Sequence, residues 1–174
     1  MNNNPTKKEL VEILDSSFFA VALADMKNCL NANPNLPVFI LGVCFIDALS
    51  GFAFGKTKKH DNQDKGRFKN FVKRYLTGYN ADDLWEVRSD LLHSYATHQY
   101  SFANKKSYLH NKTTVDGKKI INDEDFYSDI ETAYRNFRND ILKDSKIFTN
   151  TKKRLLVFGV MKINETEIPD IPKK

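Results

Sequence analysis

The sequence has few of the residues that build metal and cofactor sites. It contains two cysteines, one tryptophan and four histidines among 174 residues. No CxxC, HxxxH or His–Cys spacing favours a metal site. There is also no glycine-rich loop of the kind that holds nucleotide phosphates, and no internal repeat. We therefore expect neither a metal nor another cofactor.

The apolar segments of the chain are typical of a folded core and predict neither a signal peptide nor a membrane span. Cys29 and Cys44 lie in apolar runs, which predicts buried thiols in a reducing compartment. The polar N-terminus lacks the apolar stretch of a signal peptide, so a cytoplasmic location is expected. Residues 38–55 approach the length of a membrane span, but Asp47 lies in the middle and two glycines interrupt the run. We interpret the run as a buried core helix and expect no membrane partner.

The composition is that of a folded globular protein. Hydrophobic residues make up 41% of the chain and charged residues 28%. A chain of this length can form one domain with a substantial core. We assign residues 1–162 to a single helical domain and residues 163–174, with two prolines, to a loose C-terminal tail.

Helical periodicity recurs along most of the chain. Thr6 and Glu9 can form a capping box, and Asn80 can cap a later helix. Around residues 98–121 the period is lost. There, residues 100–102 and 107–110 resemble the strands of a hairpin, and Asp116-Gly117 suggests another turn. The expected helices span residues 6–30, 38–54, 65–76, 81–95, 123–142 and 150–160. The predicted fold is all-α, an up-down antiparallel bundle of four to six helices with a small β-hairpin insertion after the fourth.

The net charge of +5 is unevenly distributed. Residues 56–76 hold eight Lys and Arg residues against two Asp. A basic segment of this kind favours an anionic partner such as nucleic acid, although it is equally typical of a solvated helix face. The candidate phosphate-binding residues on the predicted helix are Lys65, Arg67, Lys69, Lys73 and Arg74.

The most informative motif is Arg88-x4-His93-x-Tyr95. Arginine offers a permanently charged fork that matches phosphate oxygens, and histidine can transfer protons near neutral pH. Random placement of these residue types gives the three-residue set at a rate of about 0.006. The motif therefore indicates phosphate chemistry that needs no metal.

On an ideal helix, Arg88 falls within an apolar stripe that includes Leu84, Leu91 and Tyr95. A charge there needs a partner, and Asp47 is a candidate. His93 lies about 140° around the helix from Arg88, so the two side chains are not adjacent. A two-fold dimer would instead supply two copies of each to a shared cleft.

On these residues the chain resembles the HEPN (higher eukaryotes and prokaryotes nucleotide-binding) family of small helical bundles. Arg88 and His93 match that family's R-x4-6-H motif. Tyr95 extends it to the R-x4-H-x-Y form found in HEPN toxins paired with minimal nucleotidyltransferase antitoxins. The resemblance extends loosely over residues 6–160. Ser89 is a departure, since many active members carry an amide-like polar residue there.

The resemblance implies a metal-independent endoribonuclease that acts as a homodimer, in a toxin or defence role. The 2′-hydroxyl of RNA would attack the adjacent phosphorus. His93 would transfer protons and Arg88 would stabilise charge on the phosphoryl oxygens. Tyr95 would be the position at which a partner nucleotidyltransferase attaches adenylate. Supporting roles would fall to Ser89, Asp90 and Asp47.

Two other interpretations remain open. A non-catalytic HEPN-like module would bind nucleic acid, a nucleotide or a protein partner, and Ser89 favours this alternative. A helical dimer with a scaffolding role would lock Arg88 in an ion pair and leave His93 at the periphery.

Overall fold

The structure, a computed structural model, describes residues 4–31, 36–58, 62–94 and 100–159. Most of these residues are helical and two short strands pair, so the predicted helical class is confirmed. In chain order the elements are α1 (Lys7–Asp15), α2 (Phe18–Asn31), α3 (Leu36–Ala53), α4 (Asp64–Tyr75), α5 (Ala81–Ser94), β1 (Tyr100–Ala103), the 3₁₀ turn η1 (Ser107–Leu109), β2 (Lys119–Asn122), α6 (Asp123–Lys143) and α7 (Ser145–Phe158).

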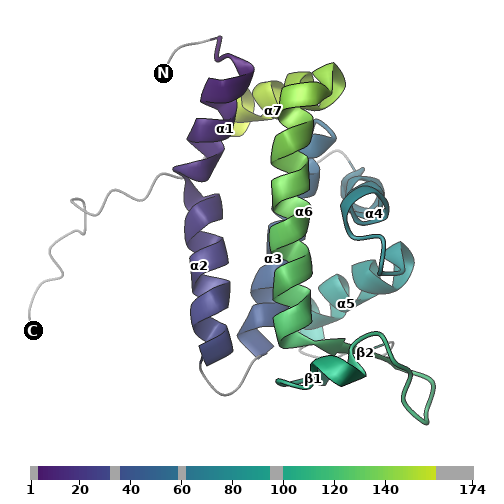
Figure 1. Cartoon of the computed structure of the whole chain (residues 1–174). Coiled ribbons are helices and arrows are strands. Elements are labelled where there is room, and N and C mark those ends of the chain that lie inside the picture. Colours follow the sequence, from purple (N-terminus) through teal and green to yellow (C-terminus); the bar gives the residue numbers. More distant parts are fainter. Residues whose placement is uncertain (1–3, 32–35, 59–61, 95–99, 160–174) are drawn as a thin grey trace, which may run out of the picture.

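Helix α3 lies at the centre of the packing, as its apolar sequence predicts. Figure 1 shows α1 and α2 on one side of α3 and α6, α4 and α5 on the other, and the small sheet at one end. Helix α3 contacts α2, α4, α5, α6 and α7. In the described part of the chain it is the one helix long and apolar enough to cross a membrane, yet 61% of it is buried inside the protein. This burial explains why α3 can carry apolar side chains on all of its sides.

The first predicted helix is two helices. The capping box of Thr6 and Glu9 is confirmed, because each side chain accepts a hydrogen bond from the other's backbone N–H. The prediction of one helix over residues 6–30 is wrong. Ser16 and Ser17 interrupt it, and their hydroxyls donate to the carbonyls of Glu12 at 2.8 Å and Leu14 at 2.5 Å. Side-chain hydroxyls that bond to nearby carbonyls offer the backbone an alternative to the helix.

Helices α4 and α5 begin and end within one residue of the predicted positions, as far as the chain is described. The Asn80 cap is confirmed, since its side-chain oxygen accepts from the N–H groups of Asp82 and Asp83 at 2.9 and 3.2 Å. This cap fixes the first turn of α5. Helix α5 is the element that carries Arg88 and His93.

The predicted hairpin is wrong. Strand β1 pairs in parallel with β2, with Tyr100 opposite Lys119, and residues 107–109 form the 3₁₀ turn η1. The turn at Asp116-Gly117 is confirmed, because Gly117 has φ of +84° and the Thr114 N–H bonds to the Lys118 carbonyl at 2.8 Å. Parallel pairing requires a long crossover, which residues 104–118 supply. Local β propensity identified the residues of β1, but it wrongly assigned residues 107–110 to a strand and did not identify the partner of β1.

Helix α6 is confirmed, and α7 begins earlier than predicted. The apolar residues of α6 recur at helical spacing and are buried, namely Phe126, Ile130, Ala133, Tyr134, Phe137 and Ile141. Helix α7 starts at Ser145 instead of residue 150 because Asp144 caps it, accepting from the backbone N–H groups of Lys146 and Ile147. The predicted C-terminal tail, residues 163–174, lies outside the described residues.

A pair of glycine substitutions tests the packing of α3. At Gly42 an added Cβ would lie 2.5 Å from the Phe126 ring and 2.7 Å from the Ile130 side chain. Gly42→Ala should therefore lower the free energy of unfolding by about 1–3 kcal/mol. The matched control is Gly66→Ala in α4, where nothing lies within 4 Å of the new Cβ. That change should stabilise the protein by about 0.5–1 kcal/mol through helix propensity. Urea unfolding measures the free energy of unfolding of both variants. Equal changes in the two would contradict the close packing of α3 against α6 at Gly42.

Candidate functional site

The predicted motif lies on α5. Leu84, Val87 and Leu91 turn one face of α5 into the core, where all three are buried. Arg88 is next to this face and is only partly exposed. Tyr95 lies outside the described residues, so the structure places the first two members of the motif and not the third.

Arg88 is held by an ion pair with Asp47 of α3. One of its terminal nitrogens lies 2.7 Å from the Asp47 Oδ2 atom, and the guanidinium stacks over the Trp85 ring at 5.0 Å. The side chains of Arg88 and Asp47 are 21% and 27% exposed. The Arg88 Nε atom is buried and has no hydrogen-bond partner among the described residues. The guanidinium is therefore anchored on one side and reachable from solvent on another.

The surface beside this ion pair is partly apolar. Cys44, one turn before Asp47, is exposed, so the prediction that this thiol is buried is wrong. Partial burial raises the pKa of the Cys44 thiol, and Arg88 opposes that rise. Ile40, Leu41 and Ala48 are only partly buried on the same helix. An incompletely covered stripe of α3 therefore adjoins Arg88.

His93 is exposed near the C-terminal end of α5. Because α5 is helical through both residues, His93 lies about 140° around the helix from Arg88, as the sequence predicted. Ser89 and Asp90, between them, are partly buried. One copy of the helix therefore does not direct Arg88 and His93 at a single point.

Carboxylates pair with most of the predicted phosphate-binding residues. Arg67 is 5% exposed and lies 2.6 Å from Asp64. Arg74 bridges Asp140 at 2.7 Å and Asp144 at 3.0 Å. A third pair joins Lys69 to Asp82 of α5. Lys65 and Lys73 are exposed and form no ion pair with the described residues. The pairs of Lys69 and Arg74 therefore join α4 to its neighbours, whereas the Arg67–Asp64 pair lies within α4.

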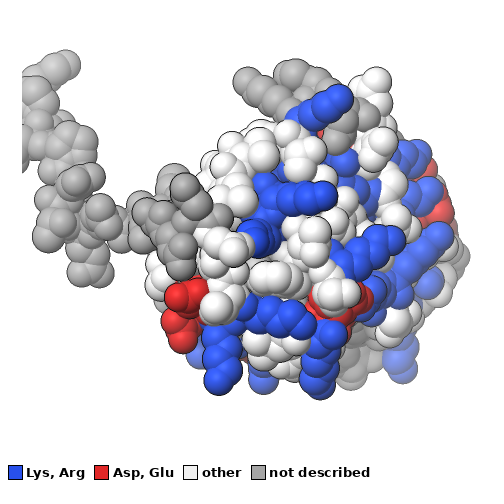
Figure 2. Space-filling view, turned by 90° about the horizontal axis from the view of Figure 1, so that it is seen from above, with Lys and Arg blue, Asp and Glu red and all other residues white. Residues whose placement is uncertain are grey.

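Helix α7 adds a second basic surface, which the sequence analysis did not single out. Lys152 contacts the Phe148 ring, and Arg154 donates to the Lys56 carbonyl at 3.2 Å. Figure 2 looks onto the end of the molecule where α1 and α7 lie in Figure 1. Lys and Arg side chains are spread over this face among few carboxylates. Counting charge over residues 145–158 would have found it, because this helix has no acidic residue and carries Lys146, Lys152, Lys153 and Arg154.

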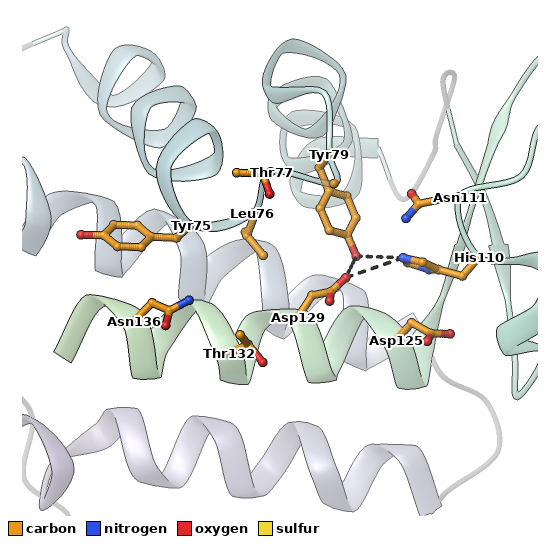
Figure 3. A pocket seen from close by; sticks show the side chains of 11 residues that line it. Tyr75, Leu76, Thr77, Tyr79, His110, Asn111, Asp125, Asp129, Thr132 and Asn136 are labelled. Carbon is orange, nitrogen blue, oxygen red and sulfur yellow. Dashed lines mark hydrogen bonds and ion pairs between the residues drawn. The ribbon is translucent and has the colours of Figure 1, made fainter. Parts of the chain in front are cut away.

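A polar cleft of about 380 Å³ lies between α6, the loop joining α4 to α5, and the residues after η1 (Figure 3). The Tyr79 hydroxyl donates to the Asp129 Oδ2 atom at 2.7 Å. The His110 Nε2 atom lies 3.4 Å from that hydroxyl and 3.6 Å from the same carboxylate oxygen. Sequence reasoning missed this cluster because its members come from three separate segments and form no motif.

No metal centre accompanies these groups in the part of the chain that the structure describes. No three His, Cys, Asp or Glu side chains there lie close enough together to hold a metal ion. The groups available for chemistry are therefore the guanidinium of Arg88, the imidazole of His93 and the polar cleft.

The Arg88–Asp47 pair can be tested by a double-mutant cycle. Asp47→Ala should lower the free energy of unfolding by about 1–3 kcal/mol, because it leaves a partly buried guanidinium unpaired. Adding Arg88→Leu should restore most of that loss. The control is Glu131→Ala, which removes an exposed ion pair with Arg135 at 2.9 Å and should cost under about 0.5 kcal/mol. Urea unfolding of the four proteins measures the coupling, and strictly additive effects would argue against the pair.

Comparison with known proteins does not assign the chain to a family. No protein-family model, curated protein or solved structure matches the chain significantly.

Proposed function

We propose that this protein is a metal-independent endoribonuclease of the HEPN type. The observation that carries the proposal is the position of Arg88. Its guanidinium is fixed by Asp47 and Trp85, yet about a fifth of the side chain stays exposed, and His93 is exposed on the same helix. An arginine held in this way can bind a phosphate with little further loss of conformational entropy.

The proposed reaction is cleavage of RNA by its own 2′-hydroxyl. A bond forms between the 2′-oxygen and the adjacent phosphorus, and the bond from phosphorus to the 5′-oxygen breaks. His93 handles the proton that leaves the 2′-hydroxyl or the one that the 5′-oxygen gains. Arg88 stabilises negative charge on the phosphoryl oxygens. Asp47 acts as a positioning residue for Arg88, with Ser89 and Asp90 flanking it. The reaction uses neither a metal nor a cofactor.

The proposed active form is a homodimer with an up-down bundle in each subunit. Arg88 and His93 diverge around α5, so one subunit is incomplete as a site. The partly exposed stripe of Ile40, Leu41 and Cys44 adjoins Arg88 and offers an apolar contact for a second copy. A two-fold axis near this stripe would bring both copies of Arg88 to one interface, and the proposed site requires that interface to extend to His93.

The proposed RNA contacts are electrostatic. Lys65 and Lys73 on α4 are exposed cations that the described carboxylates leave unpaired, and α7 contributes further positive charge. Such contacts with phosphates would weaken steeply with added salt. Lys69, Arg67 and Arg74 would contribute less, because their charges are already paired with Asp82, Asp64 and Asp140.

The biological setting we propose follows from the resemblance. The protein would be a cytoplasmic toxin or defence effector, silenced by a nucleotidyltransferase antitoxin that attaches adenylate to Tyr95. Tyr95 follows the last described residue of α5, directly beyond His93 and Ser94 in sequence. A bulky, charged adenylate there would obstruct access to His93.

The alternative is a module without catalytic activity. The Arg88–Asp47 ion pair favours it, because a structural role alone accounts for a paired arginine on a half-buried face. Such a module would bind nucleic acid, a nucleotide or a protein partner, or would act as a scaffold. The experiments below separate it from the nuclease.

Substitution of either motif residue should abolish cleavage while the fold survives. His93→Ala and Arg88→Ala should each lower the rate by about 10²–10⁴-fold, since proton transfer and charge stabilisation are both lost. The assay uses labelled single-stranded RNA in excess EDTA and analyses the product ends for a 2′,3′-cyclic phosphate. Glu86→Ala, at an exposed position of the same helix, is the control and should cleave normally. Binding of RNA without cleavage by the wild-type protein would support the module instead.

A charge placed in the exposed stripe should separate the subunits. Cys44→Glu alters an exposed side chain, so the subunit should still fold, but a dimer would bury the new carboxylate without a partner. We expect sedimentation to show a dimer for the wild type and a monomer for Cys44→Glu, with loss of cleavage. Ala20→Glu places the same charge at an exposed position of α2 and should leave the dimer intact. A wild-type monomer at every concentration would contradict this assembly.

A further inference from the structure

The cleft beside α6 is acidic although the protein as a whole is basic. Asp125 and Asp129 lie four residues apart on one face of α6 and both line the cleft. No Lys or Arg is among the residues that line it. Burial raises the pKa of the Tyr79 phenol within it, and Asp129 and Asp125 raise that pKa further. The interior of the cleft therefore carries a negative potential.

Asp129 keeps one carboxylate oxygen available. Its Oδ2 atom accepts from Tyr79, whereas no described residue donates to its Oδ1 atom. The side chain is 45% exposed, so it is neither buried nor fully solvated. Figure 3 shows the Asp129 carboxylate below the Tyr79 hydroxyl and beside the His110 ring, with Thr132 further along the same helix. A ligand in the cleft can therefore reach a carboxylate oriented by two fixed neighbours.

The neighbours of Asp129 do not form a catalytic set. The His110 Nδ1 atom accepts a hydrogen bond from the Asn122 N–H at 3.1 Å, so the ring proton is on Nε2, facing Asp129 and Tyr79. An imidazole held in this tautomer has no free lone pair on the cleft side. Burial and Asp129 raise the pKa of Tyr79, so its hydroxyl remains protonated and donates. The neighbours of Asp129 therefore offer neither a free imidazole nitrogen nor an ionised phenolate, and the Asp129 carboxylate is the charged group that a ligand in the cleft can contact.

We infer that this cleft binds a small organic cation with a primary ammonium group, such as an aliphatic diamine. An ammonium group has three donors and no acceptor. Asp129 supplies a charged acceptor, and the oxygens of Thr132, Asn136 and Asn111 supply neutral ones in the same lining. The volume of about 380 Å³ is within the range of small-molecule sites. The negative potential favours a cation over a neutral polyol of the same size.

Calorimetric titration with putrescine at low salt tests the inference on the full chain. The wild type should bind, and Asp129→Asn should weaken binding by about tenfold or more, since a hydrogen bond to a charged group is lost. Asp25→Asn removes the same charge from an exposed site on α2 and should leave the affinity unchanged. 1,4-Butanediol, the uncharged analogue, should not bind. Equal affinity of the Asp129→Asn variant, or equal binding of the diol, would overturn the proposal.

A second variant keeps the test valid if Asp129→Asn is unstable. Thr132 is exposed and lies one turn from Asp129 in the lining of the cleft. Thr132→Lys would place a tethered ammonium in the site, so it should abolish putrescine binding and raise the melting temperature. Thr132→Gln introduces a side chain of similar length without the charge. It should weaken putrescine binding less, and raise the melting temperature less, than Thr132→Lys. Unchanged putrescine binding by Thr132→Lys would overturn the proposal independently of RNA cleavage.

Discussion

The fold depends on the burial of α3. This helix has apolar residues on all sides and one charged residue, Asp47, so other helices must cover it. Gly42 allows α6 to approach closely, because any larger side chain would meet the Phe126 ring. Asp47 needs a positive partner at the edge of the core, and Arg88 of α5 provides it at 2.7 Å. The packing of the core and the position of the motif arginine therefore have the same origin.

This dependence links the structural role of Arg88 to the phosphate-binding role that we propose for it. The ion pair with Asp47 and the contact with Trp85 restrict the guanidinium, which reduces the entropy that binding a phosphate would cost. The same contacts would stabilise the fold if no phosphate ever bound. A structural arginine and a catalytic arginine thus have the same geometry in one subunit. What distinguishes them is whether a second α5 brings His93 to the exposed edge of the guanidinium.

The distribution of charge follows from which helices meet. Carboxylates of α5, α6 and the α6–α7 junction lie beside α4 and neutralise much of its basic strip, as the pairs of Arg74 with Asp140 and Asp144 illustrate. Positive charge then remains on exposed lysines of α4 and on α7, while the cleft on α6 is negative. Oppositely charged surfaces on one small protein can attract different ligands, because screening at physiological salt limits each field to about 8 Å.

The sequence by itself determined the local features. Periodicity located α4, α5 and α6, the side chains of Thr6, Glu9 and Asn80 fixed two helix starts, and the wheel placed Arg88 against the core with His93 turned away. Each of these rests on residues within a few positions of one another. Apart from the pair of Arg88 with Asp47, for which the sequence offered a candidate, only the tertiary structure decided which distant groups meet. Residues 119–122 pair with β1, acidic residues of α5 and α6 neutralise α4, and Tyr79, His110 and Asp129 gather around one cleft. The reason is that such contacts join residues 13 to 70 positions apart, whose separation in space is set by the burial of α3 and by no local pattern.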